Sequence, residues 1–249
     1  MFRNIPPVTK NLLLLNIMFF VVSVVLAQNG TDISRMLGAH YFNSFLFQPF
    51  QIVTHMFMHS ITDFFHILFN MLLLVMFGGH LERIWGSKRY FIFYIACGLG
   101  AIVLYNSIGM FQIYELKNAL VADGYDLRIL NNQLAAENFD SIQIHSFASQ
   151  ELLQEYINLS FSTLVGASGA VFGLLAGFAM LFPNTELMLL FPPIPIKAKY
   201  LIGGYLAFEI YSSIYRSGDQ IAHLAHVGGA VVGIIIILIW RKRDRSNFY

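Results

Sequence analysis

Six long apolar runs limit this chain to a narrow range of folds. A helix needs roughly 17–25 predominantly apolar residues to cross the hydrocarbon core of a bilayer. Runs of this length occupy residues 11–27, 64–80, 90–109, 166–182, 198–215 and 222–240. Only 12% of the 249 residues are Asp, Glu, Lys or Arg, about half the share found in soluble domains. The sequence therefore predicts an all-α membrane protein with six transmembrane helices, and it excludes a soluble enzyme.

The distribution of Lys and Arg predicts how these helices are oriented, because cytoplasmic loops of membrane proteins carry an excess of both residues. With the N-terminus inside, four basic residues fall on the outer side: Arg35, Lys117, Arg128 and Arg216. Eleven fall on the inner side: Arg3, Lys10, Arg83, Lys88, Arg89, Lys197, Lys199, Arg241, Lys242, Arg243 and Arg245. We therefore expect a multi-pass protein of the cell membrane with both termini cytoplasmic. The first run has no small-residue cleavage site, so we expect it to be retained as an anchor.

Residues 110–163 interrupt the membrane pattern between the third and fourth apolar runs. This segment holds half of all the acidic residues, and its apolar residues recur at helical spacing. We expect an outer-side insertion of two or three short amphipathic helices within one membrane domain, 1–249. The insertion either shields the bundle or recognises a substrate or partner. The net charge of +1 gives no reason to expect a nucleic-acid partner.

Several polar side chains lie within the apolar runs, where they are costly unless paired or functional. His66 and Asn70 share one helical face of the second run, Ser168 begins the fourth, and His226 lies near the start of the sixth. All three runs enter the membrane from the outer side. At about 1.5 Å of rise per residue, His66, Ser168 and His226 should lie at one depth and face one water-filled pocket. A hydroxyl, an imidazole and hydrogen-bond donors are the groups that nucleophilic acyl transfer requires.

Glycine spacing predicts that two of these helices pack closely. Gly169, Gly173 and Gly177 repeat every four residues on the fourth run, and Gly229 and Gly233 do the same on the sixth. Small residues let helix backbones approach each other in membranes. This approach would bring Ser168 within reach of a histidine on the sixth run, although the spacing is equally compatible with packing alone.

These residues resemble the motifs of the rhomboid intramembrane serine proteases, in the same order along the chain. Gly166-Ala167-Ser168-Gly169 resembles the family's Gly-x-Ser-Gly motif, and His66 with Asn70 resembles its His-x-x-x-Asn motif. His226 has glycine three and seven residues later, as in the family's sixth helix, whereas His223 does not. Further similar segments are Thr54 to His59 and the turn that contains Gly78, Gly79, Glu82 and Gly86.

The resemblance implies a rhomboid-like bundle and an endopeptidase that cleaves transmembrane segments of other membrane proteins. By this resemblance, Ser168 would be the nucleophile and His226 its general base, a dyad without a carboxylate. The Ser168 backbone N–H, His66 and Asn70 would stabilise the oxyanion, with Gly166 beside them. The site would open to the outer side and need no cofactor. Substrates would be single-span or multi-span membrane proteins reached through the lipid bilayer.

Three alternatives stay open at this stage. A non-catalytic rhomboid-like protein would bind transmembrane helices without cleaving them. His55 and His59 have the i, i+4 spacing of zinc ligands, but Met56 replaces the glutamate that a metalloprotease helix needs; we expect loop hydrogen bonds and no metal site. Glu209 would suit a proton pathway, but we expect it to bond a neighbouring helix or to face the pocket.

The first outer loop departs from the family pattern at one point. Where the family often has Arg after an aromatic residue, this chain has Phe50-Gln51.

Overall fold

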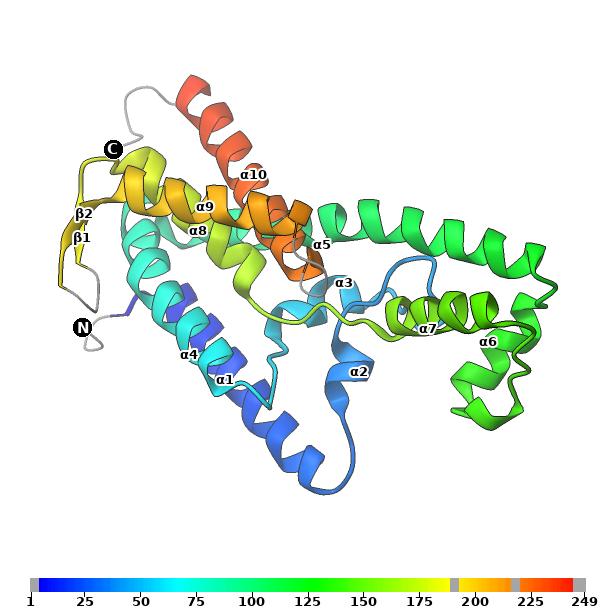
Figure 1. The fold of residues 1–249 in the computed structure, drawn as a ribbon. Coiled ribbons are helices and arrows are strands. Elements are labelled where there is room, and N and C mark those ends of the chain that lie inside the picture. The colour runs from blue at the N-terminus through cyan, green and yellow to red at the C-terminus, as the bar shows by residue number, and fades with distance from the viewer. Residues whose placement is uncertain (1–4, 189–192, 216–219, 244–249) are drawn as a thin grey trace.

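A computed structural model describes residues 5–188, 193–215 and 220–243, and the fold is largely helical (Figure 1). The first helix is α1 (Pro7–Gln28). The loop after it contains α2 (Ile33–Leu37), α3 (Gln51–Thr54) and the 3₁₀ turn η2 (His55–Phe57). The chain continues with α4 (Phe64–Leu73), the π-helical turn η3 (Leu74–Gly78) and α5 (Gly79–Ala122). There follow α6 (Leu127–Ala135), the 3₁₀ turn η4 (Phe139–Ser141), α7 (Phe147–Phe161), α8 (Ser168–Leu181), α9 (Ala198–Tyr215) and α10 (Gln220–Arg243).

Three helical stretches of the described residues are long and apolar enough to cross a membrane. They are Pro7–Gln28, Phe64–Ala122 and His223–Arg243, with Ser168–Leu181 as a shorter apolar helix. The second stretch combines two of the expected spans and is broken at Gly86, whose φ of 76° is outside the helical region. Helix α1 exposes Leu14, Met18 and Val21 on its outer face. Such a continuous apolar surface is suited to lipid rather than water.

The N-terminus of α1 is fixed by a buried carboxylate from the start of α5. Glu82 is 2% exposed and accepts hydrogen bonds from the Val8 and Thr9 backbone amides at 2.9 and 2.7 Å. The Thr9 and Ser87 hydroxyls donate to it as well, at 2.8 and 2.7 Å. The carboxylate thus satisfies amides that a helix start leaves unpaired and complements the positive end of the helix dipole.

Helix α8 lies at the centre of the bundle, packed against α5 and α10. Nearly all its side chains are buried, as expected for a helix that is apolar on every face. The predicted glycine contacts are present: the carbonyl oxygen of Gly173 would lie 3.0 Å from a Cβ placed at Gly233, and that of Gly169 would overlap a Cβ at Gly229. The two backbones therefore touch at these positions, which confirms the predicted close approach of α8 and α10.

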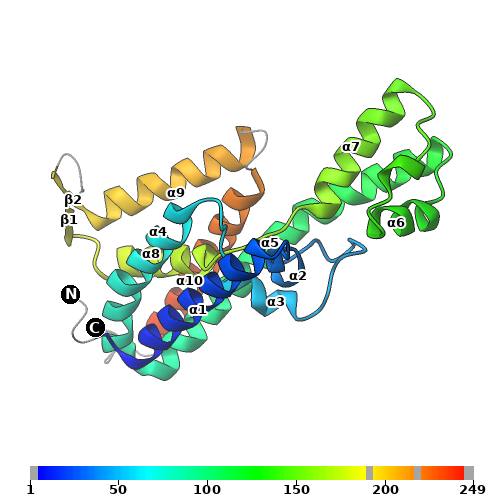
Figure 2. The same cartoon turned by 90° about the horizontal axis from the view of Figure 1, so that it is seen from below.

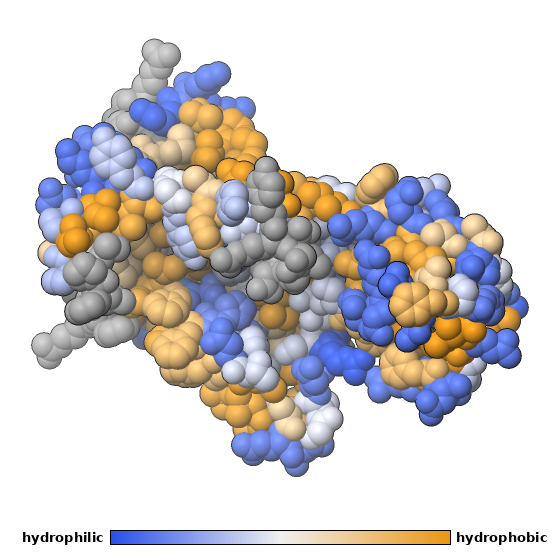
Figure 3. Space-filling model, in the orientation of Figure 1, coloured by the Kyte–Doolittle hydropathy of each residue, from blue (hydrophilic) through white to orange (hydrophobic). Residues whose placement is uncertain are grey.

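Residues 110–161 form a helical lobe that projects from the bundle (Figures 1 and 2). It consists of the continuation of α5 beyond residue 109, with α6, η4 and α7 packed beside it around Leu120, Leu134 and Tyr156. Hydrophilic residues cover much of the lobe in Figure 3, whereas apolar residues extend over the bundle. Short helices were predicted in this segment, and α6 and α7 are present there; the position of the lobe on the outer side stays a prediction. The sequence did not predict that α5 continues into the lobe without a break.

One element departs from the predicted all-α fold. Strands β1 (Glu186–Met188) and β2 (Pro195–Lys197) pair antiparallel between α8 and α9, with Glu186 opposite Lys197. Proline is abundant in this connection, and it removes a backbone donor and disfavours a helix interior. The short connection between two helices therefore forms a hairpin rather than a helical turn.

Candidate active site

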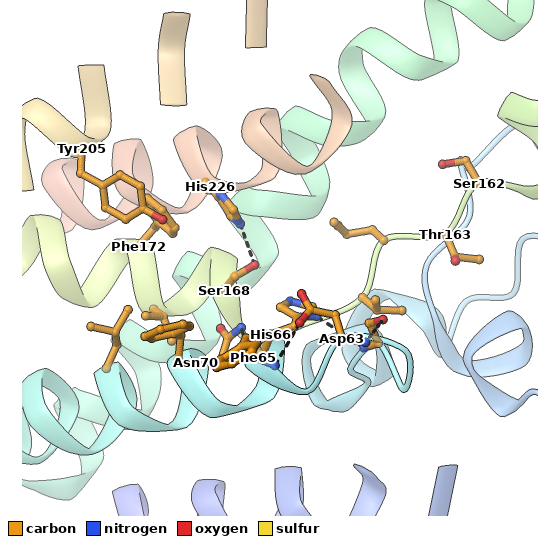
Figure 4. Close-up of a pocket in the computed structure, with 16 residues that line it drawn as sticks. Asp63, Phe65, His66, Asn70, Ser162, Thr163, Ser168, Phe172, Tyr205 and His226 are labelled. Atoms are coloured by element: carbon orange, nitrogen blue, oxygen red, sulfur yellow. Dashed lines mark hydrogen bonds between the residues drawn. The ribbon is translucent and has the colours of Figure 1, made fainter. Parts of the chain in front are cut away.

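Ser168 and His226 meet at the junction of α8 and α10 (Figure 4). The Ser168 Oγ lies 2.9 Å from Nε2 of His226, within hydrogen-bond distance. Ser168 is the first residue of α8, and His226 lies in the second turn of α10. Because the glycine contacts hold these helix backbones together, a hydroxyl and an imidazole from residues 58 positions apart become direct neighbours.

Two further groups hold the His226 ring. The Phe172 ring stacks on it with a centroid separation of 4.2 Å and an interplanar angle of 8°. Nδ1 of His226 lies 2.9 Å from Oε2 of Glu209 on α9, and Nδ1 of His223 lies 2.6 Å from the same oxygen. The expectation that Glu209 bonds a neighbouring helix is confirmed. His223, the other histidine near the start of the sixth run, bonds the same carboxylate.

Hydrogen-bond donors gather around Ser168 from the side of α4. The Ser60 backbone amide lies 3.4 Å from Nδ1 of His66, an arrangement that favours a proton on Nε2 of the same ring. That Nε2 would lie 3.0 Å from a Cβ at Gly166, and the Ser168 Oγ 3.5 Å from it. Asn70 donates from Nδ2 to the His66 carbonyl oxygen at 2.8 Å, which leaves its second N–H available to the pocket that it lines.

The backbone around Ser168 supplies a further donor. As the first residue of α8, Ser168 has an N–H without an intrahelical acceptor, and it lies at the positive end of the helix dipole. Gly166, two residues before α8, has a φ of 122°, a backbone conformation that residues with a side chain rarely adopt. Its amide donates to the His55 carbonyl oxygen at 2.9 Å, so the outer loop positions the segment that leads into Ser168.

These groups share a cavity of about 500 Å³ between α4, α8, α9 and the segment before α8. His66, Asn70, Ser168 and His226 all line it (Figure 4). The depth argument predicted that His66, Ser168 and His226 face one pocket, and all three line this cavity. Aromatic side chains from α4, α8 and α9 also line the cavity: Phe65, Phe69, Phe172 and Tyr205.

Comparison with known proteins shows which family the chain matches. The family model described as a rhomboid domain matches residues 46–113 and 129–243, which is well over half of the chain. The chain belongs to the rhomboid family. It is also 32% identical over 111 residues to the protein named "Rhomboid protein 1, mitochondrial" of Saccharomyces cerevisiae. That match covers 43% of this chain and 32% of the yeast protein, so this chain matches about a third of the length of that relative.

Every candidate site residue of this rhomboid-family chain lies within the matched ranges. His66 and Asn70 fall in the first, and Gly166, Ser168 and His226 fall in the second. Only residues 114–128 separate the two ranges, so most of the expected 110–163 insertion is included in the family match.

The loop histidines have different environments. Nδ1 of the buried His55 donates to the Gln51 carbonyl oxygen at 2.9 Å, which confirms the expected loop hydrogen bond. The buried His59 ring packs against that of His66, with the ring centroids 5.2 Å apart, and its loop hydrogen bond stays a prediction. Burial lowers the pKa of His55 to about 4 and that of His59, with help from His66, to about 3. Both rings are therefore neutral near pH 7.

Two contacts of the His226 ring, with Phe172 and with Glu209, were not predicted from the sequence. Phe172 lies four residues after Ser168 and therefore on the same helical face, a signal that could have suggested contact with the pocket. The position of Glu209 against His226 depends on how α9 rotates about its axis against α10. No periodic pattern in the sequence encodes that rotation.

Proposed function

We propose that this chain is an intramembrane serine endopeptidase that cleaves transmembrane segments of other membrane proteins. The observation that carries the proposal is the 2.9 Å contact between the Ser168 Oγ and Nε2 of His226. A serine hydroxyl is a weak nucleophile until an adjacent base accepts its proton. His226 is placed to be that base, and the cavity beside it is lined with donors.

In the proposed mechanism, Ser168 attacks the carbonyl carbon of the scissile bond while His226 accepts the hydroxyl proton. The resulting oxyanion is stabilised by the Ser168 backbone N–H, by Nε2–H of His66 and by the Asn70 amide. Such preorganised donors contribute strongly because they need no reorganisation during the reaction. His226 then donates its proton to the leaving amine, and a water molecule hydrolyses the acyl-enzyme by the reverse sequence of proton transfers.

The proposed topology is a single membrane domain, 1–249, of six spans with both termini cytoplasmic. Helices α1, α4, α5, α8, α9 and α10 correspond to the six apolar runs. The excess of Lys and Arg on one side supports the orientation, although Arg3, Arg216 and Arg245 lie outside the described residues. The lobe, the outer loop and the active-site opening would then all lie on the outer side of the cell membrane.

The substrate segment is proposed to enter from the lipid between α9 and α4. Aromatic side chains of both helices line the cavity there, and Phe65 of α4 is 62% exposed. A peptide bond within a helix has its carbonyl in the helical hydrogen-bond ladder, so the segment must unwind before it is cut. We therefore expect preference for substrates with Gly, Ala or Ser near the cleavage site.

The decisive experiment uses the purified full-length chain in proteoliposomes with a single-span substrate that carries Gly-Ala near its outer end. Wild type should cleave the substrate and react covalently with a fluorophosphonate probe. The Ser168→Ala variant should do neither while keeping the wild-type thermal unfolding midpoint. Ser107→Ala is the matched control, because Ser107 is exposed and its hydroxyl donates to the Val103 carbonyl oxygen within α5; it should behave as wild type.

Cleavage by the Ser168→Ala variant would overturn the assignment of the nucleophile. Substrate binding without cleavage by wild type, together with no probe labelling, would instead support a non-catalytic rhomboid-like protein. The intact contact between Ser168 and His226 argues against that alternative, because a binding protein has no need for the pair.

A further inference from the structure

The carboxyl group of Glu209 lies on the opposite edge of the His226 ring from Ser168. We infer that Glu209 is a positioning residue that completes a Ser168–His226–Glu209 triad, in place of the dyad that the sequence motifs imply. The inference rests on the proposed proteolytic function, and it adds a residue from α9, which carries none of those motifs.

The two contacts of the His226 ring determine where its protons lie. Oε2 of Glu209 accepts a hydrogen bond from Nδ1 at 2.9 Å, so the neutral ring carries its proton on Nδ1. Nε2 is then unprotonated and can accept the Ser168 proton across the 2.9 Å contact. A neutral imidazole has one donor and one acceptor nitrogen, and Glu209 selects the tautomer that the proposed reaction requires.

The surroundings of Glu209 explain why it can remain ionised in an apolar helix. Its side chain is only 3% exposed, and burying an unpaired charge inside a membrane is costly. Nδ1 of His223 donates to the same oxygen at 2.6 Å, so two N–H groups compensate the carboxylate. His223 thereby anchors Glu209 while Glu209 holds His226, and the stacked Phe172 ring restricts the remaining rotation of His226.

The same geometry stabilises the charge that forms during acylation. The Ser168 O–H bond breaks, its proton moves to Nε2 of His226, and the oxygen electron pair forms the bond to the substrate carbonyl carbon. Nδ1 keeps its proton, so the ring becomes a cation beside the Glu209 carboxylate, which stays unprotonated. Opposite charges attract more strongly where water is scarce. When the intermediate collapses, the Nε2 proton moves to the leaving nitrogen.

The test compares kcat, KM and the pH profile of cleavage for wild type and Glu209→Gln in proteoliposomes. We expect kcat to fall about 10²-fold or more with little change in KM, because the amide can orient the ring wrongly and lacks the charge. The acidic limb of the pH–kcat profile should move to lower pH, because the His226 cation loses its counter-charge. A merely structural role would not move that limb.

Glu82→Gln is the matched control, since Glu82 is another buried carboxylate with several donors but lies away from the site. It should lower the thermal midpoint and leave the pH profile of cleavage unchanged. If Glu209→Gln retains wild-type kcat and pH profile while Ser168→Ala is inactive, the triad is wrong and the proteolytic function stands. An active Ser168→Ala variant would instead refute the proposed function itself.

A measurement on the wild-type protein keeps the inference testable if Glu209→Gln does not fold. Nitrogen-15 NMR of histidine-labelled protein, with His226→Ala used for assignment, should show His226 protonated on Nδ1 near neutral pH. A proton on Nε2 would overturn the triad. One ligand atom each from Glu209, His223 and His226 also lies within 4.8 Å of the other two. Cleavage that is lost on dialysis against a chelator and restored by Zn²⁺ would also overturn it.

Discussion

At the scale of single residues, the conformation of Gly166 links the outer loop to the proposed oxyanion site. Gly166→Ala should lower kcat/KM about 10-fold or more, because a side chain at φ of 122° costs on the order of 1–3 kcal/mol of strain. The added Cβ would also lie 3.0 Å from Nε2 of His66 and would displace that donor. Steady-state cleavage of the Gly-Ala substrate measures the effect.

Gly203→Ala on α9 is the control for this prediction. A Cβ at Gly203 would meet no atom within 4 Å, so the variant should cleave the substrate at the wild-type rate. If Gly166→Ala also does so, the strain and the displacement of His66 have no effect on the reaction, and the role of Gly166 in the site would be rejected.

A residue of the candidate site could be predicted from the sequence where a periodic pattern fixes its position, and not where side-chain packing does. The depth and glycine patterns predicted that Ser168 meets a histidine of the sixth run, because helical rise converts position into depth and glycine faces indicate which helices touch. The resemblance to the rhomboid motifs selected His226 over His223. The depth argument also predicted that His66 faces the same pocket, whereas its role at the oxyanion stays a prediction. The contact of Glu209 with His226 could not be predicted, because the rotation of α9 depends on side-chain packing along α10 and α8.

At the scale of elements, the bond network of Glu82 connects the start of α1 to α5. Burial alone would raise the pKa of the Glu82 carboxyl, but hydrogen bonds from Thr9, Ser87 and Val8 hold it below its usual value of 4.5. The ionised form is therefore favoured by folding. Its contribution to stability is complete above pH 4.5 and is lost as the pH falls through the lower pKa of the folded protein.

Glu82→Gln should therefore lower the thermal unfolding midpoint in detergent at pH 7, by loss of about 1–3 kcal/mol of charge-assisted hydrogen bonding. The difference from wild type should shrink below pH 4.5, where the wild-type carboxyl becomes protonated. Scanning fluorimetry from pH 3 to pH 7 measures both effects. The exposed Glu115→Gln variant is the control and should match wild type. A constant difference at all pH values would show that the charge contributes nothing.

The ends of the helices could not be predicted from the apolar runs alone. The apolar run at 90–109 ends where lipid contact was expected to end, but α5 continues to Ala122 because its lobe section keeps one apolar face with Ile113, Leu116 and Leu120. An apolar run indicates only the part of a helix that contacts lipid, whereas the end of the helix also depends on packing outside the membrane.

At the scale of the whole molecule, the lobe is tied to the outer loop and to the segment before Ser168. The Lys117 ammonium donates to the Asn43 carbonyl oxygen at 2.6 Å, and the Ser44 hydroxyl donates to that of Ser160 at 3.1 Å. Ala39 and Leu164 exchange backbone hydrogen bonds of 2.9 and 2.8 Å. These contacts lie at the base of the lobe, so its tip can be separated from the active site by mutation.

We predict that the tip of the lobe is dispensable for catalysis and that its base is not. His145 donates from Nδ1 to the Asp123 carbonyl oxygen at 2.9 Å, so a short Gly-Ser link can replace residues 124–144. This variant should keep its kcat on the generic substrate, while its thermal midpoint should fall because the buried Leu130 and Leu134 are lost. Buried leucines typically contribute about 2–5 kcal/mol each.

Ala39→Pro provides the opposite test, because proline removes the N–H that donates to the Leu164 carbonyl oxygen and adds ring atoms at a fully buried position. Gly38 already has the extended conformation, with ψ of 152°, that a residue before proline prefers. This variant should keep an intact lobe and lose cleavage, because the segment leading to Ser168 is no longer held against the outer loop.

The variant with the shortened lobe has a different contradicting outcome. If it folds but cannot cleave the substrate, the lobe is a recognition element, because removal of a shield alone leaves the active-site geometry unchanged.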